Sequence, residues 1–304
     1  MIDTLHFNID RRHYDRDKIL KVFYEKFKFK SDTRYTFGTS IKATYLNWTF
    51  RLTGKELKCS GSLTKLWIGN NLQNLPICFV PMALKKLEEI LEIKLGEAQI
   101  KRIDVGCTLP VSNSCNLYLD MLVRPAAYSI TSYENQTKMF RKWDNTIVFY
   151  DKRKEIEARK TAVSVPQDIN YLRYEIRHIK RIKKVLETKN CNLSNLYSEI
   201  VLNRLMATWY ESYRQTPKLS KVSDFMMDYE TLDQYKMSLI YEGVRSFGGV
   251  TTLLSDVRKP KGNRFSRKRI RDFLTKMGNV EPFNPVLQEE LDRKIEEIYL
   301  QSLL

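Results

Sequence analysis

Three strand-forming segments of this chain carry charged side chains at positions where β-strands are usually apolar. They span residues 101–105, 148–152 and 172–177. In the first segment, strand alternation places Arg102 and Asp104 on one face. In the third, it places Glu175 on one face together with Arg173 and Arg177. A sheet face that carries Asp104, Glu175 and nearby arginines is costly to leave unpaired, and an edge position or salt bridges would account for it.

Sequence periodicity changes near residue 190. Before this point, alternation of period two predicts several further strands: a hairpin over 43–69 with its turn at 53–55, and strands over 128–133 and 146–151. Apolar residues at helical spacing predict helices. Before residue 190 they predict one helix from residue 15 and others over 82–96 and 115–123. Beyond residue 190 they predict helices over 193–214, 265–278 and 285–304. We expect an α+β fold with two domains. Residues 1–190 form a domain of mixed strands and helices, and residues 191–304 form a mostly helical C-terminal domain.

The charge of the chain indicates a polyanionic partner. Fifty-two Lys and Arg residues against 36 Asp and Glu residues give a net charge of +16. Such a surplus attracts nucleic acid or an anionic membrane surface. The basic residues are spread along the whole chain and neither end has a basic amphipathic anchor, which favours nucleic acid. No apolar run is long enough to span a bilayer and no signal-type segment opens the sequence, so we expect a cytoplasmic protein without a membrane partner.

Acidic residues on strands of a cationic chain suggest metal-assisted chemistry on a phosphate. Carboxylate oxygens suit Mg²⁺ or Mn²⁺, which stabilise charge on a scissile phosphate. A neighbouring tyrosine, such as Tyr150 or Tyr174, can attack phosphorus and form a covalent phosphotyrosine. Cross-strand ion pairs on a solvated sheet face explain the same residues without any chemistry. Spacing alone leaves both explanations open, and the three histidines offer no His-x-His metal pair.

Several short motifs occur along the chain in a definite order: R-I-D at 102–104, V-x-Y-D-K-x-x-E at 148–155, L-R-Y-E-I-R at 172–177, the opening MID, and the later SLIYEGVRSFGGVTTL and RFSRKRIRDFLTKMG. Together they resemble the replication initiators of the filamentous-phage gene II type and the related rolling-circle plasmid initiators. The resemblance extends over most of the chain. It implies a DNA nickase with a five-stranded antiparallel sheet, which acts in the host cytoplasm if the protein is phage-encoded.

The resemblance also implies roles for individual acids. Asp104 and Glu175 correspond to metal-binding carboxylates, and Mg²⁺ or Mn²⁺ is the expected ion. Asp151 and Glu155 follow the second motif directly. Either of them is expected to add a ligand or to position one.

The nucleophile has two main candidates, and Tyr171 and Tyr197 are lesser alternatives. Tyr150 lies where the phage-type initiators place their nucleophilic tyrosine, whereas the L-R-Y-E-I-R motif of the plasmid type points to Tyr174. We prefer Tyr150 because the opening and the C-terminal motifs are of the phage type. Lys152 follows Tyr150 closely and is expected to take part in the reaction by holding a phosphate beside the nick.

Basic residues in two regions are expected to contact DNA. They are Arg102, Arg173 and Arg177 on the strands, and Arg264, Arg267, Lys268 and Arg271 around a basic C-terminal helix. A loop followed by a basic helix is a common way to enter a groove or grip a backbone. A solvated helix face explains the second group equally well.

These observations predict a rolling-circle replication initiator. It would nick and rejoin origin DNA through a covalent 5′-phosphotyrosine, and its partners would be double- and single-stranded origin DNA, a host helicase and a polymerase. The chain has no P-loop motif for nucleotide binding. A non-catalytic, sequence-specific DNA-binding regulator is the alternative. It explains the charge but not the acids on the strands.

Overall fold

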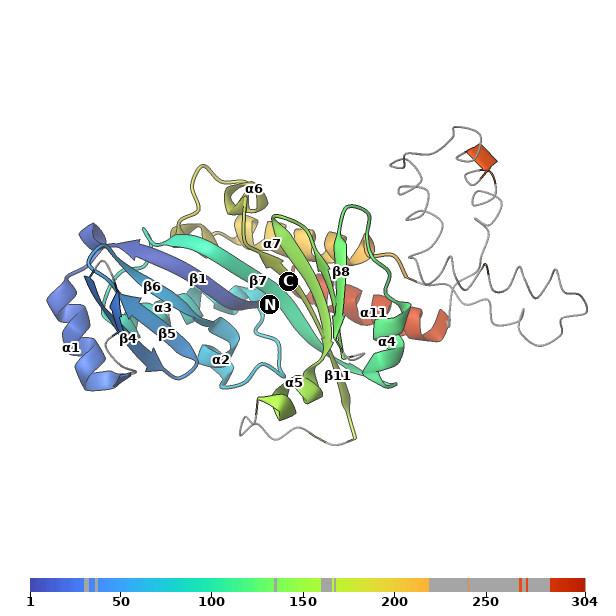
Figure 1. The fold of residues 1–304 in the computed structure, drawn as a ribbon, viewed down its shortest axis with the longest axis horizontal. Coiled ribbons are helices and arrows are strands. Elements are labelled where there is room, and N and C mark those ends of the chain that lie inside the picture. Colours follow the sequence, from blue (N-terminus) through green and yellow to red (C-terminus); the bar gives the residue numbers. More distant parts are fainter. Residues whose placement is uncertain are drawn as a thin grey trace, which may run out of the picture.

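A computed structural model describes residues 1–29, 33–35, 38–133, 136–159, 166, 168–218, 240, 268–269, 272 and 285–303 of the chain. Its centre is an antiparallel sheet (Figure 1). The strands follow one another across the sheet in this order: β2 (Lys28–Phe29), β4 (Gly38–Tyr45), β5 (Trp48–Leu52), β6 (Glu56–Ser62), β1 (Ile2–Asp10), β7 (Gln99–Val111), β11 (Asn170–His178), β10 (Asn145–Asp151), β9 (Thr137–Arg141) and β8 (Ser129–Tyr133), with β3 (Thr33–Tyr35) against β4.

Helices connect the strands, and several of them cover one side of the sheet. They are α1 (Arg16–Lys26), α2 (Leu63–Ile68), α3 (Val80–Leu91), α4 (Cys115–Met121), α5 (Lys152–Ala158), α6 (Ile182–Leu186), α7 (Glu199–Arg214) and α11 (Pro285–Gln301), with single turns of tighter helix at η1 (Arg11–His13), η2 (Ile77–Phe79) and η3 (Leu193–Tyr197). Figure 1 shows α7 and α11 behind the central strands, whereas no labelled helix crosses in front of β1, β7 and β11.

Local chemistry sets where the short helices begin. The side chain of Asp15 accepts hydrogen bonds from two backbone N–H groups at the start of α1, and Asp151 caps α5 through the N–H of Lys154. Ser62 caps α2 in the same way through Lys65. This cap, together with apolar residues three apart, turns residues 63–68 into a helix. The prediction that the β-rich hairpin continues to residue 69 was therefore wrong.

Alternation along β11 assigns its two faces to different environments. Tyr174 and Ile176 are buried on the helix-covered side, where Tyr174 packs against Trp209 of α7. Arg173 and Glu175 point to the opposite side. The strand register places Tyr150 of β10 beside Arg173. The open face of the central strands therefore carries the polar side chains.

The α+β class and the antiparallel sheet were predicted correctly, but the sheet extends well beyond five strands. The hairpin of β4 and β5 widens one side, and β8 with β9 widens the other. Strand β9 was not predicted, because the segment TKMFR is short and mostly polar. The division near residue 190 stays a prediction. In the described residues, Trp209 of α7 and Leu291 of α11 lie in the same apolar core as the sheet.

No helix in the described ranges combines the length and the apolar character needed to cross a bilayer.

His178 makes the stability of the fold depend on pH. Its side chain is 1% exposed, and neither ring nitrogen has a hydrogen-bond partner among the described residues. Burial lowers the pKa of His178 to about 4. The unfolded chain therefore binds more protons than the folded one between its ordinary pKa of 6.5 and about 4. This contribution to stability is complete above the upper value and decreases as the pH falls towards the lower one.

We expect the wild type to lose up to about 3 kcal/mol of its free energy of unfolding over this range through His178. The variant His178→Leu should lose much less, as measured by urea denaturation at several pH values. The control His13→Gln changes an exposed histidine and should keep the wild-type dependence of the free energy of unfolding on pH. The same pH dependence in His178→Leu as in the wild type would show that other groups cause it.

Candidate active site

A pocket of about 340 Å³ lies on the open face of the central strands. Half of the fourteen predicted site residues line it: Arg102, Asp104, Tyr150, Lys152, Glu155, Glu175 and Arg177. They come from β7, β10, α5 and β11, which lie next to one another in the sheet or pack beside it. The predicted residues that the pocket brings together are up to 75 positions apart in the sequence.

Tyr150 and Glu175 form the centre of the pocket. The phenol Oη of Tyr150 donates a hydrogen bond of 2.9 Å to Oε1 of Glu175. Burial and the neighbouring carboxylate raise the pKa of Tyr150 well above its usual value, so the phenol is neutral. Burial alone would raise the pKa of Glu175, but attraction to Arg173 and Arg177 outweighs it and holds this pKa well below its usual range. Tyr150 is therefore oriented by a carboxylate that stays ionised.

Gly106 allows Glu175 to occupy this position. It lies directly opposite Glu175 in the pairing of β7 with β11. A Cβ atom added at Gly106 would come within 2.7 Å of Cγ of Glu175 and of the backbone oxygen of Tyr174. Any larger residue there would push the carboxylate or the strand away.

Arg173 holds the floor of the pocket together. Its side chain is 1% exposed and donates to Oδ2 of Asp3 at 2.7 Å, to Oε1 of Glu175 at 3.0 Å and to Oγ1 of Thr108 at 2.9 Å. Arg173 is not among the residues that line the pocket, and its donors are engaged within the protein, so its predicted DNA contact has no support in this arrangement. Asp3 was missed as a site residue. The sequence feature that could have revealed Asp3 is its position in the opening MID, as an acid on a strand with apolar neighbours.

Asp104 faces two guanidinium groups. Arg102 binds it through both oxygens, at 2.7 and 2.6 Å, and Nε of Arg177 lies 4.0 Å from its Oδ2. Burial raises the pKa of Asp104 to about 6, although Arg102 opposes this shift. Arg177 also donates to Oε2 of Glu175 at 2.9 Å. This arginine therefore bridges the two acids that the resemblance identifies as metal ligands.

Lys152 and Glu155 form one wall of the pocket. Nζ of Lys152 lies 2.7 Å from Glu155 and 5.7 Å from the ring centroid of Tyr150, and its side chain is 1% exposed. Burial lowers the pKa of Lys152, which makes its ammonium a better proton donor than an exposed lysine. Glu155 also pairs with Arg159. Asp151 serves as the helix cap described above and does not line the pocket, so its predicted role as a metal ligand has no support in the geometry.

Tyr174 is excluded as a nucleophile by its position. Its ring is fully buried on the helix-covered face, stacked on Phe149 at 4.7 Å, and its hydroxyl donates to the backbone oxygen of Trp209. The prediction that kept Tyr174 as the second candidate was wrong, since consecutive residues of a strand face opposite sides of the sheet.

The acids of the pocket do not form a ready metal site. Asp3, Asp104, Glu155 and Glu175 all line it, but each oxygen pair already binds an arginine or lysine. Within the described ranges, no group of three or more acids, histidines or cysteines is arranged to hold a metal ion. A divalent ion would need Arg102 to leave Asp104 and Arg177 to leave Glu175 first.

The predicted DNA contacts at the C-terminus lie largely beyond what the structure describes. Arg264, Arg267 and Arg271 fall outside the described residues, and Lys268 is exposed. The strand residues Arg102 and Arg177 are 28% and 26% exposed at the pocket, where a phosphate can reach them.

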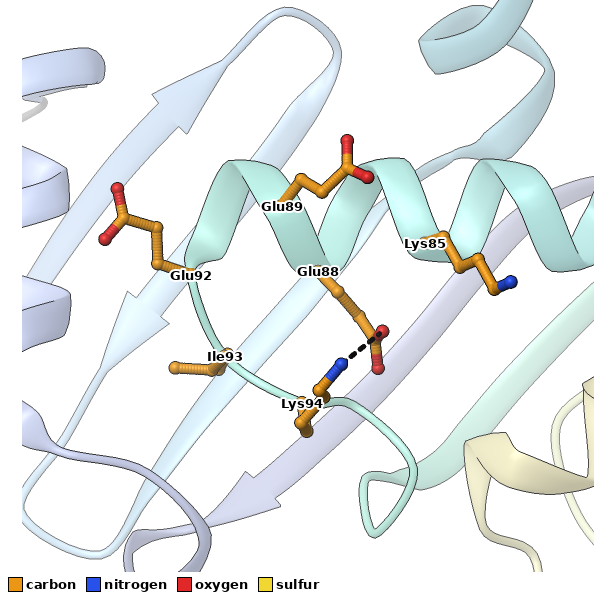
Figure 2. A pocket seen from close by; sticks show the side chains of 6 residues that line it. All are labelled: Lys85, Glu88, Glu89, Glu92, Ile93 and Lys94. Carbon is orange, nitrogen blue, oxygen red and sulfur yellow. Dashed lines mark ion pairs between the residues drawn. The ribbon is translucent and has the colours of Figure 1, made fainter.

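A second hollow of about 320 Å³ lies at the end of α3 and is lined by Lys85, Glu88, Glu89, Glu92, Ile93 and Lys94. Figure 2 shows that the carboxylates of Glu89 and Glu92 point away from Glu88, which pairs with Lys94. These acids do not converge on a common point. The hollow therefore lacks the arrangement needed to bind a ligand through them.

No protein-family model matches the chain, and no curated protein is significantly similar to it. The geometry of the pocket is thus the main evidence on what the site does.

Gly106 offers a test of the pocket's construction. We expect Gly106→Ala to lower the free energy of unfolding by about 2 kcal/mol through overpacking against Glu175 and the β11 backbone. The control Gly54→Ala should change it little, because nothing lies within 4 Å of the Cβ position there. Urea denaturation of both variants measures the difference. Equal stability of the two variants would contradict the close approach of β7 and β11.

Proposed function

We propose that this chain nicks and rejoins DNA at an origin of rolling-circle replication, with Tyr150 as the nucleophile. The observation that carries the proposal is the convergence of Tyr150, Glu175 and Lys152 in one pocket rimmed by arginines. A solvated face of ion pairs would not require a buried phenol bonded to a buried carboxylate. The resemblance to rolling-circle initiators supports the same residues from independent grounds.

The first bond forms between Oη of Tyr150 and phosphorus, and the bond from phosphorus to the 3′ oxygen breaks. The phenol proton passes to Glu175, which already accepts a hydrogen bond from it. In the empty pocket this transfer is unfavourable, because the pKa of Glu175 is lowered and that of Tyr150 is raised. A bound phosphate that attracts Arg177 removes one of the cations that lower the pKa of Glu175 and thereby makes it a stronger base.

The leaving 3′ oxygen needs a proton, and Lys152 is placed to supply it. Its ammonium lies beside the Tyr150 ring, and burial favours loss of its proton. After the step, the protein carries a 5′-phosphotyrosine and the DNA has a free 3′ hydroxyl. In rejoining, the roles reverse: Lys152 takes the proton from the 3′ hydroxyl and Glu175 returns one to the phenol.

Cations around the pocket suit a phosphodiester. Arg102, Arg159, Arg177 and Lys65 line it together with Lys152. They would hold the two non-bridging oxygens and stabilise the charge of the transition state. Mg²⁺ or Mn²⁺, origin DNA, and a host helicase and polymerase in a cytoplasmic setting belong to the proposal through the resemblance alone. Nicking with and without a chelator tests the need for an ion.

A non-catalytic DNA-binding regulator is the second candidate. It is favoured by one observation, that each acid in the pocket is already neutralised by a basic partner. The regulator would bind the same DNA tightly without forming a covalent adduct.

Two tyrosine variants separate these functions and test the nucleophile. On supercoiled DNA carrying the replicon's own origin, we expect Tyr150→Phe to form no open circles and no protein-linked strand. Tyr174→Phe loses only its bond to Trp209, at a cost of about 1 kcal/mol in stability, and should still nick. An adduct formed by Tyr150→Phe would refute the assignment, and a wild type that binds but never nicks would favour the regulator.

Lys152 can be tested with a modified substrate. We expect Lys152→Met to slow nicking of ordinary DNA by about 100-fold or more, as for loss of a general acid. A 3′-bridging sulfur at the scissile position is a good leaving group without a proton, so it should restore most of the rate of Lys152→Met. Arg159→Met serves as a control that removes a charge from the same wall, and sulfur should not rescue it. Equal defects of Lys152→Met on both substrates would assign Lys152 to binding.

A further inference from the structure

Trp143 is an exposed indole in a chain that otherwise buries its tryptophans. It lies in the turn between β9 and β10, and 54% of its surface is accessible. Trp48 and Trp209 are buried, and Trp67 packs partly against the core. Because an exposed indole keeps a large apolar face in water, such residues are typical of binding surfaces.

Two basic side chains lie over the Trp143 ring. The guanidinium carbon of Arg181 is 4.4 Å from the ring centroid, and Nζ of Lys180 is 5.3 Å from it. Arg181 adopts a left-handed backbone conformation with φ of 54°. For a residue with a side chain this conformation is unfavourable, so the surrounding structure must hold Arg181 in it. Trp143, Lys180 and Arg181 therefore combine an aromatic surface with positive charge held in a defined position.

Backbone hydrogen bonds hold the two loops together. The carbonyl oxygen of Asp144 accepts hydrogen bonds from the N–H groups of both Ile179 and Lys180, at 3.1 and 3.2 Å. The turn that carries Trp143 is thus tied to the segment that carries its cations. A ligand meets a surface that is already assembled, which reduces the entropy lost on binding.

The surroundings of Trp143 are strongly basic. Lys142 precedes it, and Lys183 and Lys184 follow on α6, all of them exposed. Within the described ranges, none of these lysines, nor Lys180 or Arg181, pairs with a carboxylate. The one acid at the turn, Asp144, has its Oδ1 atom buried. The charge is therefore available to an anionic ligand.

We propose that Trp143, with Lys142, Lys180 and Arg181, binds single-stranded DNA. A base stacks on the exposed part of the indole, and the basic side chains contact the phosphates next to it. Bases paired within a duplex cannot stack on a protein side chain in this way, so the site selects unpaired strand. An acidic peptide would use the cations but would gain little from the indole.

The site lies on the same segment as the proposed nucleophile. Trp143 precedes Tyr150 by seven positions, which corresponds to about 23 Å along a strand. The inference rests on the proposed function for the role of the strand: Trp143 would hold unpaired DNA at a distance from the nick. Binding itself does not depend on whether the chain nicks.

Binding of a labelled oligothymidine of about 12 nucleotides, a usual length for such surfaces, tests the proposal through fluorescence anisotropy. We expect Trp143→Ala to weaken binding by about 5- to 100-fold, the range for loss of one base–aromatic stack. Trp143→Phe should retain most of the affinity, and Arg181→Gln should weaken binding and reduce its salt dependence. Bound oligothymidine should quench the tryptophan fluorescence of the wild type and much less that of Trp143→Phe.

Matched controls are available on α1. Tyr24→Ala removes another exposed aromatic residue, which is 69% exposed, and Lys21→Gln removes an exposed charge. Both should bind oligothymidine as the wild type does. Equal binding by Trp143→Ala and wild type would overturn the proposal, as would competition by poly-glutamate as strong as that by unlabelled oligothymidine.

Different results would refute the nickase and the single-strand site. A wild type that never nicks, but whose binding depends on Trp143, would leave the single-strand site in place and refute the nickase. If nicking depends on Tyr150 but oligothymidine binding does not depend on Trp143, only the single-strand site is refuted.

Discussion

The site is built on one buried arginine. Arg173 lies almost fully inside the protein, and its guanidinium joins Asp3 of β1, Glu175 of β11 and Thr108 of β7. Removing one partner of such a buried group leaves an uncompensated charge and typically costs about 3–5 kcal/mol. These three strands cannot slide past one another without breaking the contacts. The network thus sets the register on which every other position in the pocket depends.

The distribution of polar groups follows from the two faces of the sheet. Apolar residues of β7 and β11 pack against α7 and α11, which cover one face of the sheet, whereas α5 lies at the pocket on the opposite face. On the other face, guanidinium groups pair with the carboxylates of Asp104 and Glu175, which is the condition for burying acids. Glu175 then orients the phenol of Tyr150. An open polar face with a fixed phenol is suited to a flexible anionic polymer that must approach from solvent.

Part of the site was predictable from the sequence. Alternation places Asp104 and Glu175 on polar strand faces and the resemblance singles out Tyr150, and all three line one pocket. Tyr174 could also have been excluded in advance, because it neighbours Glu175 in the same strand and must face the other side. The burial of Arg173 could not be foreseen. Its partner Asp3 is 170 positions away in the sequence, and only the pairing of β1 with β7 and β7 with β11 brings the two together.

The sequence by itself determined the α+β class, the alternation that creates a polar face, and the positive charge that points to nucleic acid. These are local or additive properties, so periodicity and composition are sufficient to find them. Only the tertiary structure decided which strands are neighbours, that Arg177 lies between Asp104 and Glu175, and that Trp143 meets Arg181. Contacts of this kind depend on strand register and on loop geometry, to which residues far apart in the chain contribute jointly.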